Sequence, residues 1–383
     1  MTIAEILSNE ELRNHEFPVT RDKVFLAHAA VCPLPRRVAE AVREYATIST
    51  QGDQEALMPD GLIPRTRAAA AKLLKATPEE IALVGPTSLG LSFVASGLKW
   101  KRTDNILVYF DDYPSNVYPW MALAEKGVKV RFLNIRELGK IRMIDVMGQV
   151  DENTRLVALA SNHFVGGFRV DIAAMGKFLR ERKILFCVDG IQTLGAFPTT
   201  VEHVDFLAAD AHKWLLGPCA AGIFFVRKAA QEKLAPQVYG WNNVNCPNFS
   251  AQEQIVFKPD ARRYEAGSEN LLGLVGLRAA MEMLLEVGVD NIAEELLRKR
   301  AWFVPELLKK DYTVLHADAP PQHASAIMSI YREGTDLTPL HQKLTENKIV
   351  TSLRADRTGR KYIRISPHFY NTDAELHRVL ELL

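Results

Sequence analysis

Short apolar runs alternate with helix-like segments between residues 65 and 228, and this alternation limits the folds open to the chain. Many of the runs are rich in Val, Leu, Phe and Ala, which is typical of strands buried on both faces of a parallel sheet. The pattern predicts an α/β domain with a mostly parallel sheet and helices on both faces. The expected strands lie at 81–84, 105–109, 129–133, 156–160, 185–189, 206–209 and 222–227.

The pattern changes after an irregular stretch at 240–259 that contains Pro, Asn and Gly. Two long helices and short strands are expected there, which indicates a smaller α+β domain at the C-terminal end. The helices are expected at 271–287 and 292–308, and the strands near 326–331 and 362–366. We expect a large domain at 20–260 and a small domain formed by 1–19 with 261–383.

Composition excludes several classes of partner. The chain has 383 residues with 47 Lys and Arg against 46 Asp and Glu, so neither nucleic acid nor an anionic membrane is an expected partner. The N-terminus is acidic and amphipathic, and no run is long and apolar enough to span a bilayer. The four cysteines are scattered without metal-ligand spacing, and we expect no metal site. We expect a soluble protein of the reducing cytoplasm.

Two of the expected strands lead to ionisable side chains. One ends on Asp189, and Lys213 follows the next. Ligands of α/β sheets sit at the carboxyl ends of strands, so these side chains are expected to converge. Pyridoxal phosphate needs such a pair, because a Lys amine holds it as a Schiff base and a carboxylate keeps its pyridine nitrogen protonated. The alternative is a capping Asp and a solvated Lys.

The segments around this pair resemble a known enzyme family. They read Val-Asp-Gly-Ile-Gln-Thr-Leu-Gly-Ala at 188–196 and Asp-Phe-Leu-Ala-Ala-Asp-Ala-His-Lys-Trp-Leu-Leu-Gly-Pro at 205–218. They are similar to the class V aminotransferase family of fold-type I pyridoxal phosphate enzymes, and the isopenicillin N epimerase-like and cysteine desulfurase-like branches are nearest. The resemblance extends from about Phe25 to Thr372. It implies that Asp189 and Lys213 are catalytic.

Further residues are expected to hold the cofactor. Thr87 and Ser88 open a helix after a strand, where unpaired amides favour an anion, although an ordinary helix cap is the alternative. The resemblance implies that they bind the phosphate and that Tyr113 stacks on the ring. Gln192 is placed to hydrogen-bond the phenolic oxygen of the ring. His212 is expected to hold the phosphate or line the pocket.

A second subunit is expected to complete the site. The segment Tyr-Glu-Ala-Gly-Ser-Glu-Asn at 264–270 resembles the family segment whose hydroxyl reaches the partner's cofactor phosphate. Ser268 would therefore bind cofactor across a homodimer with shared active sites. The alternative is a capping box in which Ser268 caps the following helix.

The substrate is expected to bind through arginine. Arg364 lies within an apolar strand, and a buried guanidinium needs an anion. The resemblance implies that this anion is the substrate's α-carboxylate, whereas an internal Asp or Glu is the alternative. Arg354 is expected at the same entrance. His28 matches an N-terminal active-site segment of the family, and a purely structural histidine is the alternative.

The reaction is predicted less narrowly than the cofactor. We expect an enzyme acting at the α-carbon of a small amino acid, of aminotransferase, epimerase or C–S lyase type. A cysteine desulfurase-like sulfur transferase is the alternative, but residues 341–363, which precede Arg364, contain no Cys to carry a persulfide. A nucleotide-dependent oxidoreductase would need a Gly-x-Gly-x-x-Gly turn, which the sequence lacks. A non-catalytic binding protein would be expected to have lost Lys213, Asp189 or the phosphate turn.

Overall fold

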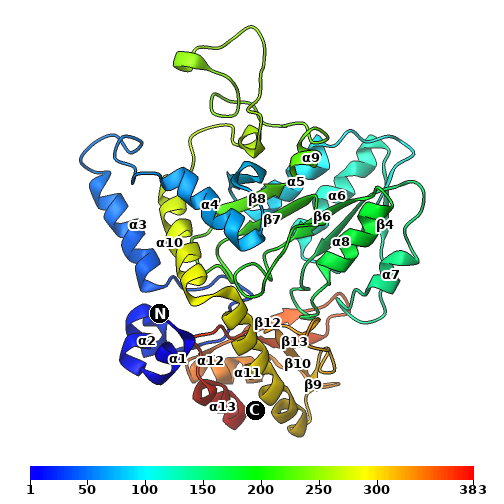
Figure 1. Cartoon of the computed structure of the whole chain (residues 1–383). Coiled ribbons are helices and arrows are strands. Elements are labelled where there is room, and N and C mark those ends of the chain that lie inside the picture. The colour runs from blue at the N-terminus through cyan, green and yellow to red at the C-terminus, as the bar shows by residue number, and fades with distance from the viewer.

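A seven-stranded sheet lies at the centre of the large domain (Figure 1). The computed structural model describes residues 1–383. The strand order is β2-β8-β7-β6-β5-β3-β4; the run from β7 to β4 is parallel, and β8 is antiparallel to both of its neighbours. The mostly parallel sheet is therefore confirmed. The strands are β2 (Ile81–Val84), β3 (Asn105–Val108), β4 (Lys129–Phe132), β5 (Thr154–Ala160), β6 (Leu185–Asp189), β7 (Phe206–Asp210) and β8 (Gly222–Val226).

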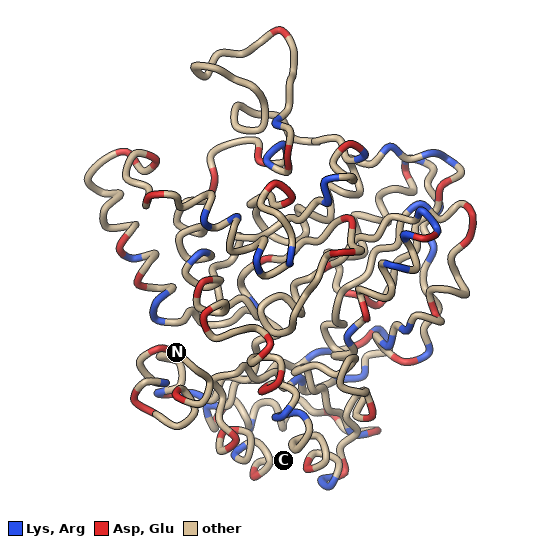
Figure 2. The backbone as a smooth tube through the Cα atoms, viewed as in Figure 1, with Lys and Arg blue, Asp and Glu red and all other residues tan.

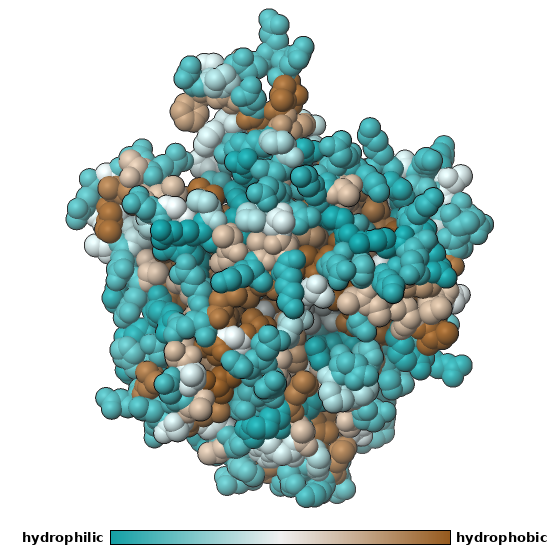
Figure 3. Space-filling model, viewed as in Figure 1, coloured by the Kyte–Doolittle hydropathy of each residue, from teal (hydrophilic) through white to brown (hydrophobic).

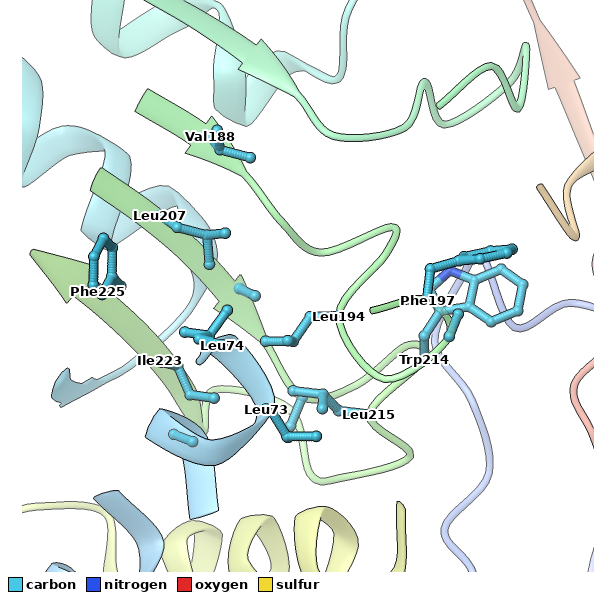
Figure 4. Close-up of a cluster of buried hydrophobic side chains, with 14 of the residues drawn as sticks. Leu73, Leu74, Val188, Leu194, Phe197, Leu207, Trp214, Leu215, Ile223 and Phe225 are labelled. Atoms are coloured by element: carbon cyan, nitrogen blue, oxygen red, sulfur yellow. The ribbon is translucent and has the colours of Figure 1, made fainter. Parts of the chain in front are cut away.

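Apolar side chains alternate between the two faces of this sheet, because successive residues of a strand point in opposite directions. In β5, Val157 and Leu159 join one core, while Leu156 and Ala158 join the other. Figure 4 shows part of the first core, which includes Leu207 of β7 and Leu74. The helices of this domain are α3 (Arg36–Ile48), α4 (Leu62–Leu74), α5 (Thr87–Gly97), α6 (Tyr118–Met121), α7 (Met143–Met147), α8 (Ile172–Glu181), α9 (Lys228–Gln231) and α10 (Leu271–Val287).

A four-stranded antiparallel sheet forms the small domain, at the bottom of Figure 1. Its order is β12-β13-β10-β9, and β1 pairs separately with β11 in parallel. The strands are β1 (Val24–Phe25), β9 (Thr313–Val314), β10 (Met328–Tyr331), β11 (Ile349–Val350), β12 (Ser352–Ala355) and β13 (Lys361–Ile365). The helices are α11 (Val289–Lys309), α12 (Thr338–Glu346) and α13 (Asp373–Leu382), while α1 (Ile3–Ser8) and α2 (Glu10–Glu16) lie at the N-terminus.

The packing does not follow the expected domain boundaries at residues 20 and 261. Helix α10 packs on α3 and α4, and its buried side chains belong to the core of the large domain. Val24 and Leu26 instead join the core of the small sheet. The reason is that α10 carries apolar residues on most of its surface, so it is buried between elements of the large domain.

Lys and Arg are interspersed with Asp and Glu over most of the chain (Figure 2). None of the helices combines the length and apolar character needed to cross a membrane. One segment between α9 and the short 3₁₀ helix Ala261–Tyr264 extends away from the rest of the molecule, at the top of Figure 1. Residues 234–257 of this segment contain a single charged residue, Glu253.

Candidate active site

Asp189 and Lys213 lie at the carboxyl ends of neighbouring parallel strands. Asp189 is the last residue of β6 and pairs in register with Ala208 of β7, and Lys213 follows β7 by three residues. Both side chains are buried; the residues are 2% and 7% exposed. The structure therefore places the carboxylate and the amine at one edge of the sheet, as the sequence predicts.

Neither of these charged groups has the full set of partners that burial normally requires. One oxygen of Asp189, Oδ1, accepts a hydrogen bond of 3.1 Å from the Ile191 amide, and Oδ2 has no protein donor. Burial, reinforced by the nearby Asp112 carboxylate, raises the pKa of Asp189 to about 7. The Lys213 amine makes no hydrogen bond or ion pair, and burial lowers its pKa to about 8 against the attraction of Asp189. A buried amine with a lowered pKa has the chemistry of a nucleophile and a base.

The turn after β3 presents an aromatic ring to Lys213. The Nζ atom of Lys213 lies 5.1 Å from the centroid of the Tyr113 ring. Tyr113 is 45% exposed, and its other aromatic neighbour, Phe164, meets it edge to face at 5.4 Å. A face of the Tyr113 ring is thus available for stacking on a planar ligand.

The start of α5 is locked to the end of β7. The Thr87 hydroxyl accepts a hydrogen bond of 2.9 Å from the Asp210 amide. Helix α5 approaches β7 closely at Gly90, where a Cβ atom would come within 2.8 Å of Ala208 Cβ. No side chain caps α5, and the Ser88 hydroxyl makes no hydrogen bond. Because the helix begins without a capping side chain, its first amides are available to an anion.

His212 lies beside this helix start. Its Nδ1 atom is 3.0 Å from Asp210 Oδ2, although the imidazole is not aligned for a hydrogen bond. The contact is therefore an ion pair when His212 is protonated. The His212 side chain is 19% exposed, so this sequence neighbour of Lys213 is not sealed in the core.

Gln192 is already partly engaged by the protein. Its Oε1 atom accepts a hydrogen bond of 2.8 Å from Trp214 Nε1, and its Nε2 atom donates one of 3.1 Å to the Ala29 carbonyl. One amide hydrogen remains for a ligand.

Arg364 is a buried cation without an anion. It is 1% exposed, and its guanidinium donates only to the Phe164 carbonyl at 2.6 Å and to Ser352 Oγ at 3.3 Å. Its Nε atom has no partner. Burial, reinforced by the positive charge of Arg354, lowers the pKa of Arg364 to about 9. The alternative of an internal Asp or Glu partner for Arg364 is therefore wrong. Arg354 also lacks an ion pair, and it donates a hydrogen bond of 3.3 Å to the Leu353 carbonyl.

His28 fits its structural alternative better than a role in substrate binding. It is fully buried, its Nδ1 atom contacts the Ser366 carbonyl at 2.9 Å, and its Nε2 atom contacts the Tyr370 hydroxyl at 2.7 Å. Both ring nitrogens are thus occupied by the protein. Burial also holds the pKa of His28 well below its usual value.

Asn162 is a further candidate site residue, and the sequence alone did not indicate where its side chain points. It follows β5, it is fully buried, and neither amide atom has a hydrogen-bond partner. Its neighbour His163 is instead satisfied, since Nε2 contacts the Asp111 carbonyl and Nδ1 accepts from the Gly166 amide. The only signal for Asn162 in the sequence was that a polar residue follows a predicted strand directly. Three consecutive residues at that place are polar, so the sequence did not single out Asn162.

Ser268 is exposed and does not cap α10. Its hydroxyl donates to Glu55 Oε1 at 3.1 Å. The cap of α10 is Asn270, whose side chain accepts from the Gly273 amide at 3.0 Å, so the capping alternative for Ser268 is wrong. Ser268 does line a cavity of about 300 Å³ together with Gly85 and Leu89 of the α5 turn.

Residues 24–379 match the family model described as aminotransferase class-V. The chain belongs to this family. It is similar to a probable cysteine desulfurase of Methanothermobacter thermautotrophicus (26% identical, 98% of each chain) and to the uncharacterised aminotransferase YcbU of Bacillus subtilis (25% identical, 95% of each).

Solved structures share the fold of this class V chain. An apo cysteine desulfurase from Thermococcus onnurineus superposes with a TM-score of 0.87 at 23% identity, covering 97% of this chain and 96% of the other. The cystine C–S lyase C-DES, in complex with its reaction product cysteine persulfide, gives 0.85 at 21% identity, covering 95% and 98%.

The class V chain is an enzyme that depends on pyridoxal 5'-phosphate. The groups described above have the chemistry that this cofactor needs: an unpaired buried amine, a carboxylate oxygen without a donor, and an uncapped helix start.

Proposed function

We propose that this enzyme cleaves the C–S bond of a small sulfur-containing amino acid of the cysteine or cystine type. The observation that carries the proposal is the buried Arg364 without an anion, beside the unpaired amine of Lys213. Such a site suits a carboxylate-bearing amino acid. The choice of sulfur chemistry follows the relatives, several of which are named cysteine desulfurases or a C–S lyase. The desulfurase-like alternative therefore gains weight over transamination and epimerisation.

Each residue has a defined task in this proposal. Lys213 links to the cofactor aldehyde, Asp189 holds a proton at the pyridine nitrogen, and Tyr113 supports the ring. Thr87, Ser88 and His212 bind the phosphate, and Gln192 uses its free amide hydrogen on the ring oxygen. When bound, pyridoxal phosphate supplies an electron sink for charge at the α-carbon.

The substrate is held and deprotonated by the chain's own groups. In this proposal Arg364, with Arg354 at the entrance, binds the α-carboxylate, and the amide of Asn162, which is unpaired in the protein, adds a hydrogen bond. Lys213, released by the substrate amine, takes the α-proton as general base. The sulfur then leaves the β-carbon with the bonding electron pair. Substrate binding thereby satisfies buried groups that the protein leaves unpaired.

The sulfur acceptor separates a lyase from a persulfide-transferring desulfurase, and we propose the lyase. The hairpin of β12 and β13, which leads to Arg364, contains no Cys. Its tip is tied down instead, because Arg357 Nε donates to Asp111 Oδ1 at 2.8 Å and its guanidinium lies 4.2 Å above the Phe110 ring. Cys32 and Cys187 are buried, while Cys219 is exposed and Cys246 is half-buried. A released sulfur species passing to solvent fits this arrangement.

We also propose a homodimer with shared active sites. The projecting segment 234–257 exposes large apolar side chains: Phe249 is 76%, Ile255 64% and Val256 53% exposed. In Figure 3 this segment lies at the top, where hydrophobic residues are visible among hydrophilic ones. Exposed apolar surface of this kind marks protein contacts. In such a dimer Ser268 reaches the partner's cofactor phosphate.

The proposed reaction is tested by incubating the reconstituted enzyme with cysteine, cystine, alanine and aspartate. Sulfide or persulfide and pyruvate should form from the sulfur amino acids in equal amounts. Alanine and aspartate measure transamination and epimerisation. Turnover of these two alone, with no sulfur released from cysteine or cystine, would overturn the proposal.

Cys219 and Cys246 provide the matched control for the sulfur acceptor. A Cys219→Ser, Cys246→Ser double variant should retain sulfur release, because the proposed route uses no protein persulfide. A loss of more than about tenfold in turnover, with the cofactor still bound, would instead favour a persulfide-transferring desulfurase.

A further inference from the structure

Asp112 is a second buried carboxylate at the same edge of the sheet as Asp189. It is 6% exposed, and its Oδ2 atom accepts a hydrogen bond of 3.2 Å from the Ala160 amide. Ala160 is the register partner of Asp189 across β5 and β6. Neighbouring strands lie about 4.8 Å apart, so the two carboxylates belong to one small region of the site. The proposed reaction assigns a task to Asp189 and none to Asp112.

The hydrogen bonds of Asp112 favour its ionised form. Its carboxylate accepts from the Tyr113 amide at 2.7 Å, from Asn116 Nδ2 at 2.9 Å and from Ala160, and all three partners are donors. A protonated carboxyl would need an acceptor for its own hydrogen, and the contacts supply none. Asp189 has one donor only. Of the two neighbouring carboxylates, Asp112 is therefore the better-stabilised anion.

The pKa values of Asp112 and Asp189 follow the same order. Burial raises the pKa of Asp112 to about 6, which leaves it ionised at neutral pH. The same cause, with the charge of Asp112 added, brings the pKa of Asp189 to about 7. Lys213 is the cation that acts on both. Asn116, whose side chain hydrogen-bonds Asp112, is neutral.

We propose that Asp112 is a positioning residue whose fixed negative charge keeps a proton in the pair formed by Asp189 and the cofactor's pyridine nitrogen. A like charge next to a titrating group raises that group's affinity for a proton. The proton comes from solvent, stays between Asp189 Oδ2 and the ring nitrogen, and no other bond changes. The inference rests on the proposed placement of the ring against Asp189. The inference explains why a second buried carboxylate, Asp112, lies near Asp189, which contacts the ring in the proposed function.

The charge of Asp112 must be separated from its role in the turn. The same carboxylate holds the amide of Tyr113, so losing it would also disturb the ring's platform. Asp112→Asn removes the charge with little change in size. Asn116→Ala removes two hydrogen bonds, the one that Asn116 donates to Asp112 and the one that it accepts from Trp120 Nε1, and leaves the charge of Asp112 in place, which makes it the matched control.

The test uses holoenzyme reconstituted with cofactor labelled with ¹⁵N at the pyridine nitrogen. The ¹⁵N chemical shift, followed against pH, gives the midpoint at which that nitrogen loses its proton. Asp112→Asn should lower this midpoint by about one pH unit or more, while Asn116→Ala should keep the wild-type value. An unchanged midpoint in Asp112→Asn overturns the inference. An equal fall in both variants also overturns it, because the effect would then come from the turn.

A double variant that exchanges the residues at 112 and 116 provides a second test if Asp112→Asn does not fold. The double variant Asp112→Asn, Asn116→Asp keeps a donor and a carboxylate in the turn but moves the charge by four residues. Its midpoint should lie below that of wild type, and an unchanged midpoint would overturn the inference. A wild-type protein that takes up no cofactor at Lys213 overturns the proposed function itself, whereas normal uptake with unchanged midpoints overturns only the role of Asp112.

Discussion

At the scale of single residues, the candidate active site is marked by buried polar groups that have no hydrogen-bond partner in the protein. Arg364 Nε and both amide atoms of Asn162 are fully buried without hydrogen-bond partners, and the amine of the largely buried Lys213 makes no hydrogen bond either. An unsatisfied buried polar group costs about 1–3 kcal/mol, so a ligand that satisfies it binds more tightly. Residue types and strand ends in the sequence predicted Lys213, Asp189 and Arg364. The sequence did not predict that His28 is satisfied and Asn162 is not, because partners distant in sequence decide both.

Arg364→Lys should lower kcat/KM by roughly 10- to 100-fold, because hydrogen bonds to charged groups contribute about 1.5–3 kcal/mol and the planar fork is lost. The loss should appear mainly in KM, since the carboxylate is bound in both ground and transition states. Steady-state kinetics measure it. Arg43→Lys, on the surface of α3, is the control and should be neutral. A neutral Arg364→Lys would show that the carboxylate binds elsewhere.

Asp189→Asn should stabilise the apoprotein above pH 7. The folded pKa of Asp189 is raised to about 7 by burial, against an ordinary value of 3.8, so its folded carboxyl binds a proton more tightly than the unfolded one. Wild-type stability from this group is complete below pH 4 and is lost as pH rises to 7. The gain in Asp189→Asn should therefore vanish near pH 4.

Urea unfolding of both apoproteins across this pH range measures the difference. Asp336→Asn is a control of opposite sign, because hydrogen bonds of Thr338 lower the pKa of Asp336 to about 2. That variant should be less stable than wild type at neutral pH. Equal stability of Asp189→Asn and wild type at every pH would contradict the account of Asp189.

At the scale of elements, most expected strands and helices form where local patterns placed them. Strands β2 and β6 and helix α10 have the predicted bounds, because each is delimited by clear apolar runs and turn residues. The alternative reading of Ser268 as the cap of α10 is wrong by two residues, since Ser268 and Asn270 are both good capping residues and tertiary contacts select between them. The hydrogen bond between Thr87 at the start of α5 and Asp210 at the end of β7 could not be predicted from the sequence either.

Asn270→Ala should destabilise the protein by about 1 kcal/mol, because the Gly273 amide loses its acceptor. Ser268→Ala should leave stability almost unchanged, since its bond to Glu55 is exposed. It should instead weaken cofactor binding if Ser268 reaches a phosphate in the dimer. Thermal unfolding and cofactor titration of the two variants distinguish these effects, and a stability loss in Ser268→Ala equal to that in Asn270→Ala would contradict the assignment of the cap.

The whole molecule combines a core on each face of the large sheet, a third core at the small sheet and one projecting segment. Helix α10 belongs to the large core and β1 to the small one, so the chain crosses between them more often than a sequence boundary suggests. Local sequence patterns identify helices and strands. They do not show into which core a helix packs when it is apolar on most sides. The projecting segment was expected only as irregular chain, and its exposed side chains are a property of the folded molecule.

Phe249→Asp with Ile255→Asp should weaken dimerisation by roughly a hundredfold or more, since each buried large apolar side chain contributes about 1.5–3 kcal/mol. Sedimentation of the variant at several concentrations measures the change. Ile144→Asp, which alters an equally exposed side chain on α7, should have no effect. An unaltered dimer in the double variant would exclude the segment from the interface.

Two single variants test whether active sites are shared. Lys213→Ala and Ser268→Ala proteins should each be impaired, and mixing them should form heterodimers with one intact site of two. Recovered activity after subunit exchange supports sharing. No recovery, once exchange has been demonstrated, would place Ser268 outside the partner's site.

The attachment of the cofactor to Lys213 is the central claim, and one measurement tests it directly. Holoenzyme is reduced with borohydride, digested and analysed by peptide mass spectrometry. The visible absorption band should disappear, and the pyridoxyl group should be found on the peptide that contains Lys213. A modification on another lysine, or none on a protein that retains its cofactor, would contradict the account.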